Sequence, residues 1–174
     1  VIFGLDSELR LIYCNPAWGR FAKENGAPAL EPGRVLGMAL MGVVPAALRE
    51  FYRRAYSGVL ISGLTWQFTY ECSSADVERR FHMAVHPSPG RDALVVVNSL
   101  VHEAPHKRAA HEAGYAYRNL NGIIIMCAHC RRTKSAVNPE RWDWVPQYVE
   151  RMPKEVSHSL CPICKELHFG ALLR

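Results

Sequence analysis

The sequence predicts an α+β protein, in which a five-stranded antiparallel sheet has helices on one side and a small four-cysteine module follows it. Five short segments have the apolar patterns that are typical of strands, and two amphipathic helices lie between the second and the third of them. Two C-x-x-C pairs then follow in the last third of the 174-residue chain, at residues 127–130 and 161–164. Together these three features define the predicted fold class.

The first strands and helices are predicted from turn and cap residues. Residues 1–15 form two strands around a polar turn at residues 6–8. Asn15 and Pro16 predict a helix start, because an asparagine side chain caps a first turn and proline fits the first helical position. Pro45 begins a second, longer helix, and its apolar stripe consists of Leu48, Phe51, Tyr52, Ala55 and Val59.

Three further strands are predicted at residues 65–72, 79–87 and 93–102. The first two alternate apolar with polar side chains, and the third is almost continuously apolar. The connecting sequences, SSADVE and PSPGRD, are short and rich in turn-forming residues. Consecutive strands joined by short turns pair antiparallel, so these segments complete the sheet.

This order of elements, together with N-P-A-W and a following Phe in the first helix, resembles a PAS domain over residues 1–103. PAS domains are the sensory modules of many bacterial signalling proteins, so the resemblance implies a ligand-binding or partner-binding sensor. After the last strand the chain reads SLVHEAPHKR, where many PAS domains carry a D-I-T triplet, which leaves the mode of output open. An unidentified small molecule or haem could occupy the PAS-like pocket. Candidates to line it, each of which also fits ordinary core packing, are Trp18, Phe21, Met38, Met41, Phe68, Tyr70, Phe81, Met83 and Val97.

The chain is predicted to have three parts: a PAS-like domain at residues 1–103, a linker at 104–121 and a cysteine module at 122–174. The linker has only weak helical character, which Gly114 interrupts. The net charge of +5 lies after the first part, because residues 1–103 hold ten basic and ten acidic side chains and the remainder holds eleven and six. The cysteine-bearing third therefore carries the excess of positive charge.

One structural zinc site is predicted at Cys127, Cys130, Cys161 and Cys164. Each C-x-x-C turn points two thiolates at one spot, and two such turns supply the tetrahedron that zinc prefers. A segment of about 50 residues buries too little apolar surface to be stable alone, and a bound metal supplies the missing free energy. His158 is a candidate hydrogen-bond donor to a sulfur, with direct ligation and simple ordering of the loop as alternatives. His129 is expected to face solvent, and His168 to pack on a final helix.

The C-terminal third resembles two known classes of module. A knuckle after the strand GIIIM, a hairpin, and a second cysteine pair at a helix start together resemble a treble-clef zinc finger. The sequences MCAHCRR, WDWVPQYV and SHSLCPIC resemble a cysteine module that follows sensory and receiver domains in bacterial signalling proteins. This resemblance implies a regulatory role and indicates no reaction.

Two alternative functions stay open. Arg131, Arg132 and Lys134 follow the first cysteine pair and favour thiolate, as in a thiol redox sensor that uses the zinc cysteines. The same residues suit a zinc-dependent nucleic-acid-binding transcriptional regulator. Basic residues exceed acidic ones by only three over residues 122–174, however, and zinc with four thiolates subtracts about two charges, so nucleic acid is the weaker prediction.

Catalysis and membrane insertion have little support in the sequence. Motifs for a nucleophile elbow, a phosphate loop or a catalytic zinc site are absent, and zinc with four cysteines has no open position for water. No apolar stretch approaches the roughly 20 residues that cross a bilayer. We therefore expect a non-enzymatic cytoplasmic protein that contacts a protein partner, an upstream signalling domain or a second copy of itself.

Overall fold

The computed structural model describes residues 1–24 and 27–170. Residues 25–26 and 171–174 lie outside the described residues, and the latter are the last four of the predicted cysteine module. In the described part of the chain, no helix is both long enough and apolar enough to span a membrane.

The chain forms two compact units. The first comprises Val1–Thr69 and Phe81–Leu100, and the second comprises Tyr70–Arg80 and Val101–Arg174. The far ends of three strands of the large sheet are therefore grouped with the cysteine-bearing part. The three-part division made from the sequence, with boundaries after residues 103 and 121, stays a prediction.

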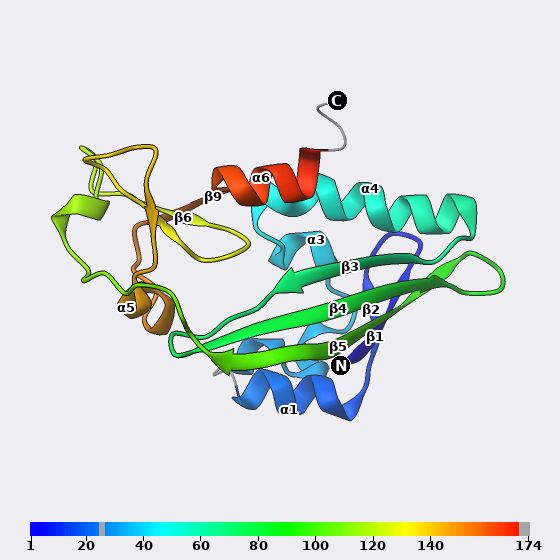
Figure 1. Cartoon of the computed structure of the whole chain (residues 1–174). Helices are drawn as coiled ribbons and strands as arrows, with labels where there is room; N and C mark the ends of the chain where they lie inside the picture. Colours follow the sequence, from blue (N-terminus) through cyan, green and yellow to red (C-terminus); the bar gives the residue numbers. More distant parts are fainter. Residues whose placement is uncertain (25–26, 171–174) are drawn as a thin grey trace. The chain divides into compact units, whose positions relative to one another are not determined.

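Five strands form one sheet in the order β2-β1-β5-β4-β3 (Figure 1). They are β1 (Ile2–Asp6), β2 (Leu11–Cys14), β3 (Trp66–Glu71), β4 (Val77–Pro87) and β5 (Ala93–Pro105). β1 pairs antiparallel with both β2 and β5, and short turns join the three later strands. The predicted α+β fold with a five-stranded antiparallel sheet is confirmed.

The helices of the first unit lie between β2 and β3 in the chain. They are α1 (Pro16–Glu24), the 3₁₀ turn η1 (Pro28–Leu30), α2 (Pro32–Val35), α3 (Leu40–Val43) and α4 (Ala46–Ser62). The predicted cap is present, because Asn15 Oδ1 accepts a hydrogen bond from the Trp18 amide at 3.2 Å. α4 ends at Gly63, whose φ of 71° is the left-handed conformation that favours glycine.

The core of the first unit lies between the helices and one face of the sheet. Alternate residues of β4 and β5 are buried, among them Val85, Leu94 and Val96, each fully inaccessible to solvent. The helices supply the other side of this core through Ala22, Val35, Leu48, Tyr56 and Val59. Burial of one face explains why the period-two pattern predicted these strands correctly.

The second unit contains a four-stranded sheet in the order β8-β7-β6-β9. Its elements are η2 (Tyr115–Tyr117), β6 (Ile124–Cys127), β7 (Thr133–Lys134), β8 (Trp142–Asp143), α5 (Pro146–Glu150), β9 (Val156–Ser159) and α6 (Pro162–Phe169). β6 pairs antiparallel with β7 but parallel with β9. The parallel pair brings the ends of two strands that are far apart in sequence to the same edge of the sheet.

A small apolar core supports this sheet. Its buried members are Tyr117, Ile124, Met126, Val145 and Tyr148. Tyr117 comes from the segment that the sequence treats as a linker, and its hydroxyl donates a 2.8 Å hydrogen bond to the buried Asp143 carboxylate. Residues 104–121 contain no α-helix, and part of this segment packs in the core.

Candidate metal centre

The four cysteines of the two C-x-x-C pairs form one buried cluster. Their sulfur atoms all lie within 4.8 Å of one another, and each residue is at most 4% exposed. Cys130 Sγ and Cys161 Sγ are 3.7 Å apart, far beyond a disulfide bond of about 2.05 Å. A tetrahedron with Zn–S distances of about 2.3 Å has edges of about 3.8 Å, so this spacing fits a zinc ion between the sulfurs.

The first cysteine pair lies on the tight turn between β6 and β7. Cys127 ends β6, and its backbone amide donates to the Arg132 carbonyl at 2.8 Å. Arg131 has a φ of 58°, a left-handed conformation that turns the chain back into β7. This turn directs Cys127 and Cys130 toward the same point.

The second cysteine pair lies at the start of α6. Cys161 occupies the N-cap position, Pro162 begins the helix, and Cys164 lies in its first turn. Parallel pairing of β6 with β9 sets Cys127 opposite Ser159, so the chain that leaves β9 enters the cluster at once. The Cys161 amide then donates to Cys127 Sγ at 3.4 Å.

The electrostatics of the cluster require a cation if all four sulfurs are to ionise. Hydrogen bonds from the other thiols, that of Cys130 first, hold the pKa of Cys127 well below its usual value. The contacts with Cys127 in turn raise the pKa values of Cys130 and Cys164 above their usual range. Like charges cannot accumulate at this spacing in a buried site, so a divalent metal is the group that the donor set fits.

Apolar side chains shield the sulfurs from water. Trp142 and Leu160 pack against the cysteine cluster. Trp144, Val145, Tyr148 and Val149 of the same part of the chain are all buried. These side chains therefore pack in the interior.

The histidines are placed differently from one another. His158 lies half-buried on β9 opposite Met126 and lines an open groove of about 510 Å³ with Ser157 and Ser159. Its role as a donor to a sulfur stays a prediction. The expectation that His129 faces solvent is wrong, because His129 is partly buried and its Nδ1 lies 2.9 Å from Nε2 of the buried His168. No local pattern indicates this pair, because the two histidines lie 39 residues apart in the chain.

Burial of His168 predicts sensitivity to acid. Burial, together with the adjacent His129, lowers the pKa of His168 from 6.5 to about 4. The unfolded chain therefore binds a proton on this residue below about pH 6.5 while the folded chain does not, and stability is lost as the pH falls from about 6.5 to 4. Between about pH 7 and pH 5 the loss is expected to be about 2 kcal/mol.

Urea unfolding of the metal-loaded protein at the two pH values measures this loss. His168→Gln keeps a hydrogen-bonding group but does not titrate, so it is expected to lose about 2 kcal/mol less than the native protein over the same interval. Subtracting the two curves removes any acid release of metal that both proteins share. Equal losses in the two proteins would contradict the prediction.

The candidate pocket residues of the PAS-like domain have different surroundings in the described structure. Trp18 and Met38 line a small apolar cavity with Leu11, Leu30, Val35, Ala39 and Val43. Several of the others pack in the core: Phe21 contacts Phe81 edge-on at 6.0 Å, Phe68 stacks on Trp66, and Met83 Sδ accepts the Tyr56 hydroxyl. Met41 and Tyr70 are half-buried, and Val97 points away from the side of β5 that buries Leu94 and Val96.

The cavity beside Trp18 and Met38 is too small for haem. Its volume is about 60 Å³, whereas pockets for drug-sized ligands occupy about 300–1,000 Å³. His82 and His86 lie toward the exposed face of the sheet, where their ring Nδ1 atoms contact Thr69 and Thr65 at 3.3 and 3.1 Å. The predicted binding of a small molecule in this unit therefore requires either a ligand of few atoms or a rearrangement of the core.

Comparison with known proteins gives one kind of likeness. No family model matches the chain, and no curated protein matches it. Among solved structures, the chain is similar to the PAS-B domain of the Drosophila melanogaster protein Cycle with bound glycerol. That similarity has 12% sequence identity and a TM-score of 0.40, and it covers 57% of this chain and 97% of the other.

Proposed function

We propose that the chain is a sensory or regulatory signalling protein whose cysteine module is held folded by a structural zinc ion. The observation that supports this proposal is the convergence of four buried sulfurs from two turns about 30 residues apart. The PAS-like unit would bind a ligand or a partner, in line with the resemblance of residues 1–103. The knuckle after β6, the β7–β8 hairpin and the cysteine pair at the start of α6 support a treble-clef-like module.

The zinc ion would be held by Cys127, Cys130, Cys161 and Cys164. Four sulfur ligands in a tetrahedron favour zinc or iron over harder metals. Four thiolates leave no open position for water or substrate, so the module's proposed role is to fold and to contact other proteins. The proposed partner is an upstream signalling domain, another protein or a second copy of the chain.

Burial of the sulfurs favours a structural role over redox sensing. Redox-sensor thiolates are accessible to oxidant, whereas these four residues are at most 4% exposed. The nucleic-acid alternative rests on Arg131, Arg132 and Lys134 and on an excess of only three basic side chains in residues 122–174. Neither alternative gains support from the described residues.

Metal content and thiol reactivity test the proposal. Elemental analysis of freshly purified, reduced protein is expected to find about one zinc ion per chain, with no visible absorption band. A chelator is expected to expose four thiols to a thiol reagent that does not reach them beforehand. Protein that contains no metal and whose cluster thiols react at once would refute the proposal, and a coloured iron-containing protein would replace zinc by iron at the same ligands.

A further inference from the structure

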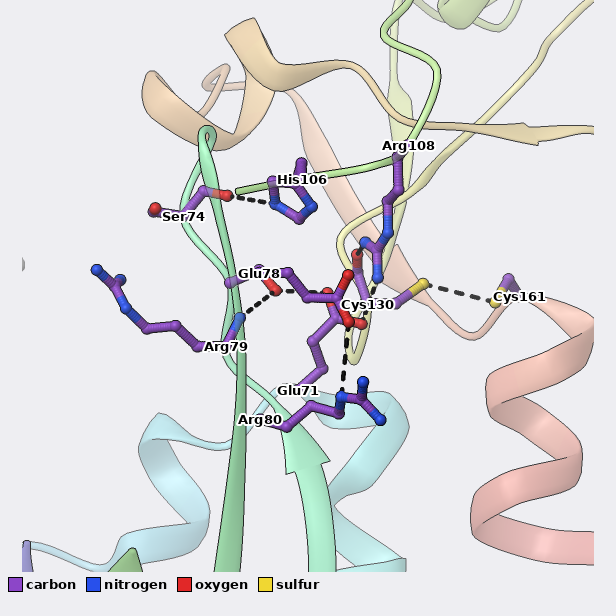
Figure 2. Close-up of polar contacts among 10 residues, drawn as sticks. Glu71, Ser74, Glu78, Arg79, Arg80, His106, Arg108, Cys130 and Cys161 are labelled. Carbon is purple, nitrogen blue, oxygen red and sulfur yellow. Dashed lines mark hydrogen bonds and ion pairs between the residues drawn. The ribbon is translucent and has the colours of Figure 1, made fainter. Parts of the chain in front are cut away.

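Arg108 lies half-buried between the first cysteine turn and the end of β3 (Figure 2). Its guanidinium donates to Glu71 Oε2 at 2.6 Å and to the Cys130 backbone carbonyl at 3.2 Å. It also lies 5.0 Å from the centre of the Trp144 ring, within reach of a cation–π contact. The side chains of Arg108 and Glu71 are only 14% and 13% exposed, so this ion pair is shielded from solvent.

The partner of Arg108 belongs to a hairpin, residues 70–80, which joins β3 to β4. His106, from the same segment as Arg108, also holds this hairpin. Its backbone amide donates to the Asp76 carbonyl at 3.1 Å. Its ring Nε2 lies 3.0 Å from the Ser74 carbonyl (Figure 2). The His106 ring packs on Trp144, with ring centres 4.3 Å apart. Residues of the second unit thus hold the hairpin at two points.

Arg108 can also neutralise part of the negative charge of a metal-loaded site. A divalent metal with four thiolates carries a net charge of about −2, and a buried charge of that size needs a compensating cation. Arg108 stays charged at neutral pH, because an arginine guanidinium is not deprotonated in proteins. Arg108 is therefore a cation that the metal site and the hairpin share.

We propose that Arg108 is a positioning residue that couples metal binding at the four-cysteine site to the order of hairpin residues 70–80. The inference rests on the proposed metal site and adds its regulation. Metal fixes the turn whose Cys130 carbonyl orients the guanidinium, and the oriented guanidinium holds Glu71. Because such coupling is reciprocal, a change that loosens the hairpin must weaken metal binding by the same factor. Glu71 is the last residue of β3, so the hairpin continues directly into strands of the large sheet.

Metal affinity in three variants tests one direction of the coupling. Arg108→Met and the isosteric Glu71→Gln are each expected to bind zinc about 10- to 100-fold more weakly, as competition with a chromophoric chelator measures it. Arg108→Lys keeps the charge without the planar fork and is expected to recover part of the loss. Arg80→Met is the matched control, because the Arg80 side chain is 53% exposed and its ion-pair partner is Glu78 on the same hairpin (Figure 2).

Hydrogen exchange in the native sequence tests the other direction. Removing zinc with a chelator is expected to speed amide exchange in residues 70–80 about tenfold or more. Residues 81–87, the remainder of β4, are expected to keep their protection. In Arg108→Met the hairpin is expected to exchange fast whether or not zinc is bound. This second readout stays decisive if one of the variants folds poorly.

The outcomes separate this inference from the proposed function. Zinc that binds equally well to the native protein, Arg108→Met and Glu71→Gln would overturn the coupling and leave the metal site intact. Equal rates of amide exchange in hairpin residues 70–80 with and without zinc in the native protein would overturn the coupling as well. A native protein that binds no metal would refute the proposed function first and the coupling with it.

Discussion

Cys127→Ser is expected to release the metal and to unfold the second unit. Structural zinc contributes on the order of 10–16 kcal/mol to the folding of small modules, which matches or exceeds the whole stability of a typical domain of about 5–15 kcal/mol. Serine does not replace a thiolate ligand, and the remaining core of five buried residues around Ile124 is small. Cys161→Ser, at the other turn of the cluster, is expected to have the same effect.

Metal analysis combined with hydrogen exchange measures this result residue by residue. Loss of zinc should coincide with loss of protection in β6 and α6, while Leu94 and Val96 in the core of the first unit stay protected. Cys14→Ser is the matched control, because Cys14 ends β2 in the first unit and lies outside the cluster. A Cys127→Ser protein that keeps one zinc per chain and its full helix content would show that the cluster is not the metal site.

Tyr117→Ala is expected to destabilise the second unit by about 3–5 kcal/mol, a loss typical of removing a buried aromatic side chain. Tyr117 is 4% exposed and packs with Ile124, Met126 and Tyr148. Its removal also takes away the hydrogen bond to Asp143, whose carboxylate is 7% exposed. Urea unfolding of the zinc-loaded protein, followed in the second unit, measures the change.

Tyr115→Ala is the matched control for this experiment. Tyr115 lies two residues earlier in the same 3₁₀ turn and is 92% exposed, so its replacement is expected to change stability by less than about 0.5 kcal/mol. Tyr117→Phe keeps the ring and removes only the hydroxyl, and we expect it to lose about 1–3 kcal/mol. Similar unfolding curves for Tyr117→Ala and Tyr115→Ala would show that the segment before β6 is a passive connection.

The features that the sequence predicted well are local ones. The strands of the large sheet were predicted because one face is buried, which imposes alternation on neighbours such as Phe81, Met83 and Val85. The start of α1 was predicted because Asn15 and Pro16 act within one turn. Each C-x-x-C turn is likewise complete within four residues, so the candidate ligand set could be read directly.

The features that sequence analysis missed depend on residues far apart in the chain. Arg108 meets Glu71 across 37 positions, and neither residue lies in a recognisable motif. Tyr117 lies in a polar segment without helical or strand periodicity, and its burial depends on strands that come later. The contact between His129 and His168 spans 39 positions and forms only after both cysteine turns have met.

The parallel pairing of β6 with β9 has a consequence for synthesis of the chain on the ribosome. Until residues beyond Cys164 have left the exit tunnel, the nascent polypeptide offers the proposed site only the two thiols of the first turn, which make half of a tetrahedral site. Capture of the proposed metal ion therefore waits until both cysteine turns have been synthesised. Translation that stops shortly before α6 would leave an unloaded, unfolded tail that proteases can degrade.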